Sequence, residues 1–186
     1  MKLNFRVSLL FVLSVFSIAR ESGAVLPDLC DGHNLFMFFK DRKDWVSARD
    51  DCILRGGRLA LINSAETHDA IKTHIRNIDE LWNAAGGGYW FGLNDRDNEG
   101  TYVFEGSAGV ELTYHDGWCS EKVGRRIVNQ PNNNTAKNPD GQDCAQLWRN
   151  NKKKPKYDFD DAYCDNRKGY ICEIVNSQDC GSGNLG

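Results

Sequence analysis

Apolar residues recur at helical spacing early in the chain. Trp45, Ala48 and Cys52 are spaced i, i+3 and i+7, so they would share one face of an amphipathic helix. Asp44 is a good N-cap for this helix, and the glycine pair at 56 and 57 is a typical end. The pattern therefore predicts a helix that covers the core with one apolar face.

A second helix is predicted shortly after the first. Ile71, Ile75 and Ile78 would lie on one face of it. Asn63 and Glu66, three positions apart, resemble a capping box, which predicts that the helix starts at Asn63. Three consecutive glycines at 86 to 88 close this helical part of the chain.

Beyond the glycines the pattern changes to short apolar runs of strand length. Together with the early run "LFMFF", five segments are predicted to be strands: 35–39, 89–93, 101–106, 143–148 and 169–174. Helices that are segregated from strands along the chain indicate an α+β domain. The connections between the strands are long and polar, so they need something to hold them, such as disulfides or metal ions.

The N-terminal residues have the pattern of a signal peptide. Lys2 and Arg6 precede an apolar run from Val7 to Ala19. We expect residues 1–19 to be removed, with cleavage after Ala24 as an alternative. The run is shorter than a membrane span, although an N-terminal anchor is the other possible interpretation. The prediction is a secreted chain with one domain at 30–180 and a short tail at 181–186.

Charge argues against nucleic acid as a partner. The formal net charge is −3. Without residues 1–19 the chain has 21 Lys and Arg against 26 Asp and Glu, a charge of −5, which is not the profile of a nucleic-acid-binding protein. One segment, "RNNKKKPK" from Arg149 to Lys156, is strongly basic. It is either a solvated surface turn or a site for an anionic ligand.

Seven cysteines in a secreted chain indicate a disulfide framework with one cysteine left over. A zinc site is the alternative, but the chain has no C-x-x-C pair. Its four histidines, at positions 33, 68, 74 and 115, are scattered. Cysteine number and spacing alone do not decide which residues pair.

Several motifs in order along the chain resemble the C-type lectin-like domain. They are the Trp45 helix, "WFGL" (90–93), "NDRDNEGTYVF" (94–104), "LTYHDGW" (112–118), "QPN" (130–132), "DCAQLW" (143–148) and "FDDAYC" to "YICE" (159–173). The resemblance covers about residues 30 to 174 and implies a C-type lectin-like fold with long Ca²⁺-binding loops. It also implies the disulfides Cys52–Cys172 and Cys144–Cys164.

The resemblance leaves three cysteines to place. In this fold the first and last strands pair antiparallel, so Cys30 before the first strand would lie near Cys180 after the last. Cys119 is then unpaired, in an insertion that is longer than the family's usual connection. We expect it on an exposed loop, either in an inter-chain bridge that links a homodimer or as a free or capped thiol.

The segment from 129 to 144, "NQPNNNTAKNPDGQDC", is either a disordered insert or a binding loop. The resemblance implies a cis bond before Pro131 and a principal Ca²⁺ site in this region. The ligands would be residues with a side-chain oxygen, as Ca²⁺ requires: Gln130, Asn132, Gln142, Asp160 and Asp161. All five carry a side-chain oxygen, which favours a binding loop over a disordered insert. In sugar-binding members the same residues also hydrogen-bond the sugar.

Four further residues match an auxiliary Ca²⁺ position of the family: Asp95, Glu99, Asn133 and Asp143. The alternative is ordinary turn chemistry, because Asp, Asn and Gly favour turns without a metal. Asn133 also begins an N-glycosylation sequon, Asn133-Asn134-Thr135, so a glycan at this position is a second prediction.

The chain departs from the family's sugar motifs. Mannose-type members resemble "EPN" and galactose-type members "QPD", whereas this chain has "QPN". Gln142 stands where glutamate is usual, and Phe159-Asp160 replaces Trp-Asn. The principal site keeps two carboxylates, Asp160 and Asp161, so we expect weak Ca²⁺ binding, with Kd about 10⁻⁴ to 10⁻³ M. The preferred sugar does not follow from this hybrid.

These observations predict a secreted, Ca²⁺-dependent carbohydrate-binding lectin, of the kind that recognises cell-surface or microbial glycans in innate immunity. The alternative is a binding module of the same fold for a protein, mineral or anionic surface, because a fold alone does not fix function. The sequence contains neither G-x-S-x-G nor H-E-x-x-H, so we do not expect an enzyme.

Overall fold

The computed structural model describes residues 28–83, 85–123, 125–150 and 155–181. The predicted signal peptide, residues 151–154 of the basic segment and residues 182–186 of the tail lie outside these ranges. Among the described residues, no helix combines the length and the apolar character that crossing a bilayer requires.

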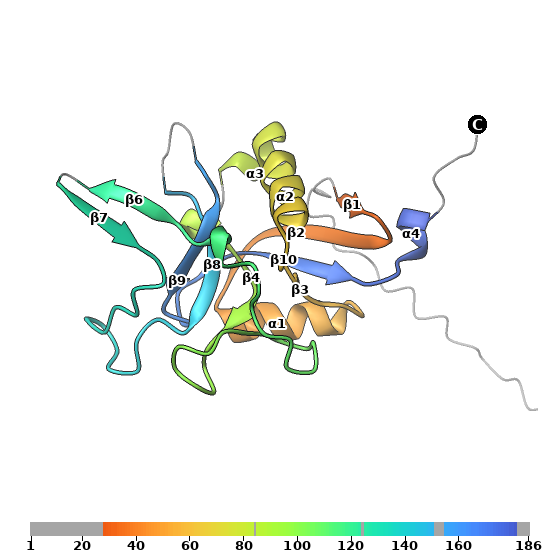
Figure 1. Cartoon of the computed structure of the whole chain (residues 1–186). Helices are drawn as coiled ribbons and strands as arrows, with labels where there is room; N and C mark the ends of the chain where they lie inside the picture. Colours follow the sequence, from red (N-terminus) through yellow and green to blue (C-terminus); the bar gives the residue numbers. More distant parts are fainter. Residues whose placement is uncertain (1–27, 84, 124, 151–154, 182–186) are drawn as a thin grey trace, which may run out of the picture.

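The described chain forms ten strands and several short helices around one mixed sheet (Figure 1). The strands are β1 (Leu29–Asp31), β2 (Asn34–Lys43), β3 (Arg58–Leu59), β4 (Gly88–Asn94), β5 (Val103–Phe104), β6 (Ser120–Val123), β7 (Arg126–Asn129), β8 (Cys144–Trp148), β9 (Asp158–Ala162) and β10 (Lys168–Ile174). The helices are α1 (Trp45–Leu54), α2 (Ala65–Asn77), α3 (Asp79–Trp82), η1 (Ala85–Gly87), η2 (His115–Gly117) and α4 (Gln178–Gly181).

The main sheet joins the two ends of the described chain. Its strand order is β1-β2-β10-β4-β8-β9, with β3 paired to β10 and β5 paired to β4. The first long strand, β2, pairs antiparallel with the last, β10, as predicted. Among the described strands, β10 pairs in parallel with β4. The predicted α+β class is therefore confirmed.

Two helices cover opposite sides of this sheet (Figure 1). The apolar face of α1 packs into one buried cluster with β4 and β10, and all three predicted face residues, Trp45, Ala48 and Cys52, are fully buried there. Asp44 caps α1, because its Oδ1 accepts a hydrogen bond from the Ser47 amide at 2.9 Å. The prediction for this helix is confirmed.

The second helix, α2, packs Ile71 and Ile75 into the other apolar cluster. Its predicted N-cap was wrong: Ser64 caps it, with Oγ accepting from Thr67 at 3.2 Å. Asn63 instead has a long-range role, since its Oδ1 accepts hydrogen bonds from the amides of Thr113 and Tyr114. Asn63 and Ser64 are both favourable N-cap residues. Ser64 takes the cap position because the Asn63 side chain is engaged by the segment at Thr113 and Tyr114.

Three disulfides are present, and all three match the expected pairs. They are Cys30–Cys180, Cys52–Cys172 and Cys144–Cys164. The first joins segments 150 residues apart in sequence, so it closes a long loop and restricts the unfolded chain.

The sequence did not predict five of the described strands, β1, β3, β6, β7 and β9, and these form two features that bear on function. The first is β9, whose residues Asp158, Asp160 and Asp161 interrupt an apolar pattern. The second is the β6–β7 hairpin, which stands out from the body of the molecule (Figure 1). The sequence signal for the hairpin was present in Gly124-Arg125, because a glycine followed by one residue is typical of a two-residue turn.

Candidate functional site

The polar segment between β7 and β8 is held against β9 by its backbone. The Gln130-Pro131 bond is cis, as the resemblance implied. After it, the Asn132 amide donates to both carboxylate oxygens of Asp161, at 3.0 and 3.1 Å, and the Asn133 amide donates to Oδ2 at 2.6 Å. One buried carboxylate therefore fixes the start of the loop.

Gln142 fixes the other end of the same loop. Its Nε2 donates to the main-chain oxygen of Asp161 at 3.0 Å, and its Oε1 accepts from the Asn134 amide at 3.0 Å. Asn132 Nδ2 in turn donates to Gln130 Oε1 at 2.5 Å. Four of the five residues predicted for the principal site, Gln130, Asn132, Gln142 and Asp161, thus form one hydrogen-bonded group, which we call the principal group.

Asp160 does not join the principal group. Neighbouring residues of a strand point to opposite faces, and Asp160 Oδ2 accepts a hydrogen bond from Gln146 Nε2 on β8 at 2.6 Å. Burial raises the pKa of Asp160 to about 7, against the lowering effect of Gln146. Burial also raises the pKa of Asp161, while the amides of Asn132 and Asn133 oppose the rise.

The principal group offers a cation little free charge. Its one carboxylate already accepts three amide hydrogen bonds, and its side-chain amides bond to one another and to the loop. Ca²⁺ takes six to eight oxygens. Within the described ranges, no three His, Cys, Asp or Glu side chains meet closely enough to form a ready metal cluster. The principal group therefore fits Ca²⁺ only if these hydrogen bonds rearrange.

The auxiliary residues fit a cation better. Asp95 is 3% exposed, and its Oδ2 accepts from the Gly100 amide at 2.9 Å. The Oδ1 atoms of Asp95 and Asp143 are buried and have no hydrogen-bond partner among the described residues. Burial raises the pKa of Asp95 to about 6, and the charges of Glu99 and Asp143 add to the rise while the Gly100 amide opposes it. A cation would satisfy these two oxygens, because buried charges require partners.

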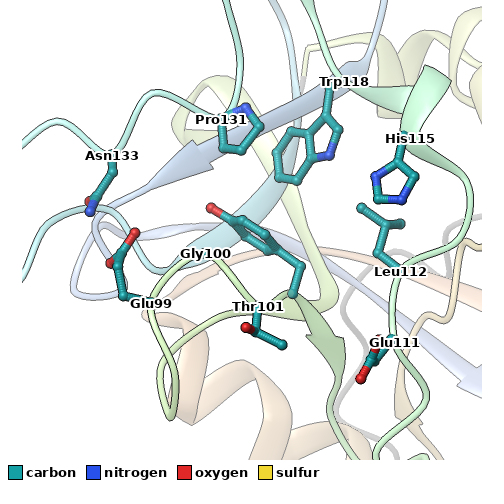
Figure 2. A pocket seen from close by; sticks show the side chains of 10 residues that line it. Glu99, Gly100, Thr101, Glu111, Leu112, His115, Trp118, Pro131 and Asn133 are labelled. Carbon is teal, nitrogen blue, oxygen red and sulfur yellow. The ribbon is translucent and has the colours of Figure 1, made fainter.

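Asn133 connects the auxiliary residues to the loop. It has a positive φ of 41°, and its Oδ1 accepts from the Gln142 amide at 2.7 Å. Its side chain and that of Glu99 point toward each other in Figure 2. Gly141 packs so closely that an added Cβ would lie 1.7 Å from Asn133 Oδ1. The glycan on Asn133 stays a prediction. To carry a glycan, the Asn133 side chain would have to leave this packed position.

A cavity of about 550 Å³ opens beside Glu99 and Asn133 (Figure 2). It is lined by Glu99, Gly100, Thr101, Tyr102, Glu111, Leu112, His115, Trp118, Pro131 and Asn133. Sequence reasoning assigned the segments 101–106 and 112–118 to a strand and to a family motif, and did not predict that their side chains would line a cavity.

The structure corrects the expected position of Cys119. This residue is 2% exposed, not on an exposed loop. Its amide donates to the Phe159 carbonyl at 2.8 Å, and its carbonyl accepts from the Gln130 amide at 2.9 Å. Burial raises the pKa of the thiol to about 11, although Asn150 lowers it. A disulfide from Cys119 to a second chain would require the thiol to leave this buried position.

Comparison with known proteins identifies similar chains. The family model described as "Lectin C-type domain" matches residues 41–174. Salivary C-type lectin 2 of Aedes albopictus is 26% identical over 144 residues, covering 77% of this chain and 85% of the relative. Perlucin-like protein of Mytilus galloprovincialis is 28% identical over 174 residues, covering 88% and 95%. In structure, the mouse scavenger receptor C-type lectin carbohydrate-recognition domain aligns with a TM-score of 0.58 and 24% identity, over 80% of this chain and 93% of the other.

Proposed function

The chain belongs to the C-type lectin domain family, and from that premise we propose that it is a secreted protein that binds carbohydrate in the presence of Ca²⁺. The main observation behind the proposal is that Asp161 binds both ends of the polar loop. The side-chain carboxylate of Asp161 holds the start of the polar loop, and the main-chain oxygen of Asp161 holds its end. Gln130, Asn132 and Gln142 are thereby gathered at one place. Relatives named salivary lectins favour secretion.

The chemistry of these side chains suits sugar hydroxyls. A hydroxyl has one donor and two acceptor lone pairs. The amide NH₂ groups of Gln130 and Asn132 can donate to it, and their side-chain oxygens can accept from it. When bound, Ca²⁺ supplies coordination positions for two neighbouring hydroxyls, as in the sugar-binding members that the sequence resembles.

The second part of the proposal concerns the auxiliary residues. Asp95, Glu99, Asn133 and Asp143 would hold a cation, supported by the two buried carboxylate oxygens that lack partners. Such a cation would stabilise the loop from 95 to 100 against the polar loop. Because only one carboxylate belongs to the principal group, we expect the principal site to be the weaker of the two.

The test is calorimetric titration of the folded protein with CaCl₂, followed by a glycan array in Ca²⁺ and in EDTA. The informative variant is Gln142→Glu, which adds a carboxylate beside Asp161 and should tighten Ca²⁺ binding about tenfold. A gain of affinity does not arise from misfolding. Asp41→Asn, an exposed carboxylate on β2, is the matched control and should leave binding unchanged. Absence of heat in both wild type and Gln142→Glu, with the fold intact, would refute the proposal.

A second candidate function is binding to an anionic surface. The β6–β7 hairpin exposes Lys122, Arg125 and Arg126. Asn150 ties this hairpin to the basic segment, because its Nδ2 donates to Glu121 and its Oδ1 accepts from the Lys156 amide at 3.1 Å. The described residues Asn150 and Lys156 of the basic segment therefore lie close to the hairpin.

Salt dependence distinguishes the second candidate from the first. Retention on heparin that survives EDTA, weakens with NaCl and falls in an Arg125→Ser/Arg126→Ser double variant would support an electrostatic surface. Retention that is the same in wild type and double variant would exclude this surface.

A further inference from the structure

The cavity of Figure 2 is a site of a different kind from the principal group, with which it shares no residue. It lies between the loop at 99–102, the segment at 111–118 and Pro131. In the view of Figure 2, Glu99 and Asn133 lie at one end and Leu112 and His115 at the other. Its volume of about 550 Å³ falls in the range of small-molecule pockets, about 300 to 1,000 Å³.

The apolar part of the cavity is preformed. The rings of Tyr102 and Trp118 meet edge to face, with centroids 4.9 Å apart. Trp118 also packs edge to face against the buried Phe159 at 5.8 Å, and the Leu112 amide donates to the Tyr102 carbonyl at 3.0 Å. These contacts fix the ring positions before any ligand arrives, which lowers the entropic cost of binding.

The charged part of the cavity is acidic. Its lining contains the carboxylates of Glu99 and Glu111 and no Lys or Arg. Neither glutamate takes part in an ion pair among the described residues. In the absence of a bound cation, these two carboxylates give the cavity lining a negative charge.

Aromatic faces and carboxylates together select a cation that carries apolar groups. An ammonium ion with methyl substituents is weakly hydrated, contacts ring faces through its methyl groups and is attracted by the ring quadrupole. We propose that this cavity binds a small alkylated ammonium ion, with Tyr102 and Trp118 as the aromatic walls and Glu111 as a counter-charge. Because Glu99 and Asn133 belong both to this cavity and to the auxiliary residues, the proposal concerns the protein without bound Ca²⁺.

Titration of the protein with choline in EDTA tests this site, with NMR following backbone amides and tryptophan indoles. We expect shifts at Trp118, Tyr102 and Glu111, and binding of 3,3-dimethyl-1-butanol, the neutral isostere, about tenfold weaker. Phosphocholine should also bind more weakly than choline, because its phosphate would face two carboxylates. If phosphocholine bound more tightly, the free cation would be the wrong ligand class.

Two variants make the result specific to the cavity. Trp118→Leu removes an aromatic wall, but Trp118 also packs on Phe159, so this change can disturb the fold. Glu111→Gln alters an exposed side chain and should weaken choline binding about fivefold. Glu80→Gln on α3 removes a similarly exposed carboxylate outside the cavity and should have no effect. Equal binding of choline and its isostere, equal effects of the two glutamate variants, or no shifts at all would overturn the proposal.

Discussion

His68 should make the protein lose stability in mild acid. This histidine is fully buried on α2. Its Nε2 faces the Tyr157 carbonyl at 2.9 Å and therefore donates, so Nδ1 accepts from the Tyr114 hydroxyl at 3.3 Å. The ring also packs on Phe159, with centroids 4.6 Å apart. The neutral ring thus joins α2 to the strand that carries Asp161 and to the segment that lines the cavity.

The size of the effect follows from the pKa. Burial, helped by Lys72 and Arg76, lowers the pKa of His68 from 6.5 to about 4, against the Tyr157 carbonyl and Asp69. Between these two values the unfolded chain binds a proton that the folded chain does not. The contribution is therefore complete above about pH 6.5 and is lost as pH falls toward 4. At 1.36 kcal/mol per pKa unit, the loss is about 3 kcal/mol.

Urea unfolding from pH 8 to pH 4, in wild type and His68→Gln, measures this loss. Glutamine can still donate to the Tyr157 carbonyl, but it does not titrate. The stability advantage of wild type over the variant should shrink by about 3 kcal/mol across this range. Carboxylates that titrate in both proteins cancel in the difference. His33→Gln, which replaces an exposed histidine, is the control and should run parallel to wild type. Parallel profiles for wild type and His68→Gln would show the reasoning to be wrong.

Two further predictions concern the loop and the thiol. Gly141→Ala should lower the melting temperature in scanning calorimetry, because φ is +94° and the new Cβ would overlap Asn133. Gly109→Ala is the control, since φ is also positive (+78°) but no atom lies near the new Cβ. It should lower the melting temperature by less. Equal losses would show that the contact with Asn133 is unimportant. Cys119 should react with iodoacetamide slowly at pH 8 in the native protein and quickly in urea, as measured by mass spectrometry, because burial raises its pKa to about 11. Fast native labelling would contradict its burial.

Sequence patterns predicted those parts of the fold that depend on residues close together in the chain. The face of α1 and its Asp44 cap followed from spacing and side-chain type. By contrast, β9 is rich in Asp, which is rare in strands. It forms a strand because β8 pairs with it along its whole length, and because Asp160 and Asp161 are buried in specific hydrogen bonds. Patterns read from a short stretch of sequence do not reveal this pairing, because it depends on contacts between separate segments.

The candidate site shows the same division. The resemblance supplied residue types and positions, and four of the five principal residues lie in one hydrogen-bonded group. It did not show that Asp160 turns toward Gln146, nor that the Asp161 carboxylate holds the loop through backbone amides. Cys119 was expected on an exposed loop because it lies in an insertion relative to the family, whereas its backbone hydrogen-bonds to Phe159 and Gln130 and its side chain is buried. These outcomes depend on contacts across the fold.

The Cys30–Cys180 disulfide has a practical consequence for anyone who wants to display this protein. It fastens β1 to α4 at the end of the molecule away from the polar loops (Figure 1). A biotin or a bead coupled near either of these elements would leave the loops facing the solution. Several copies arranged on one support would then present their binding faces in the same direction, and weak single contacts would add up to avid capture.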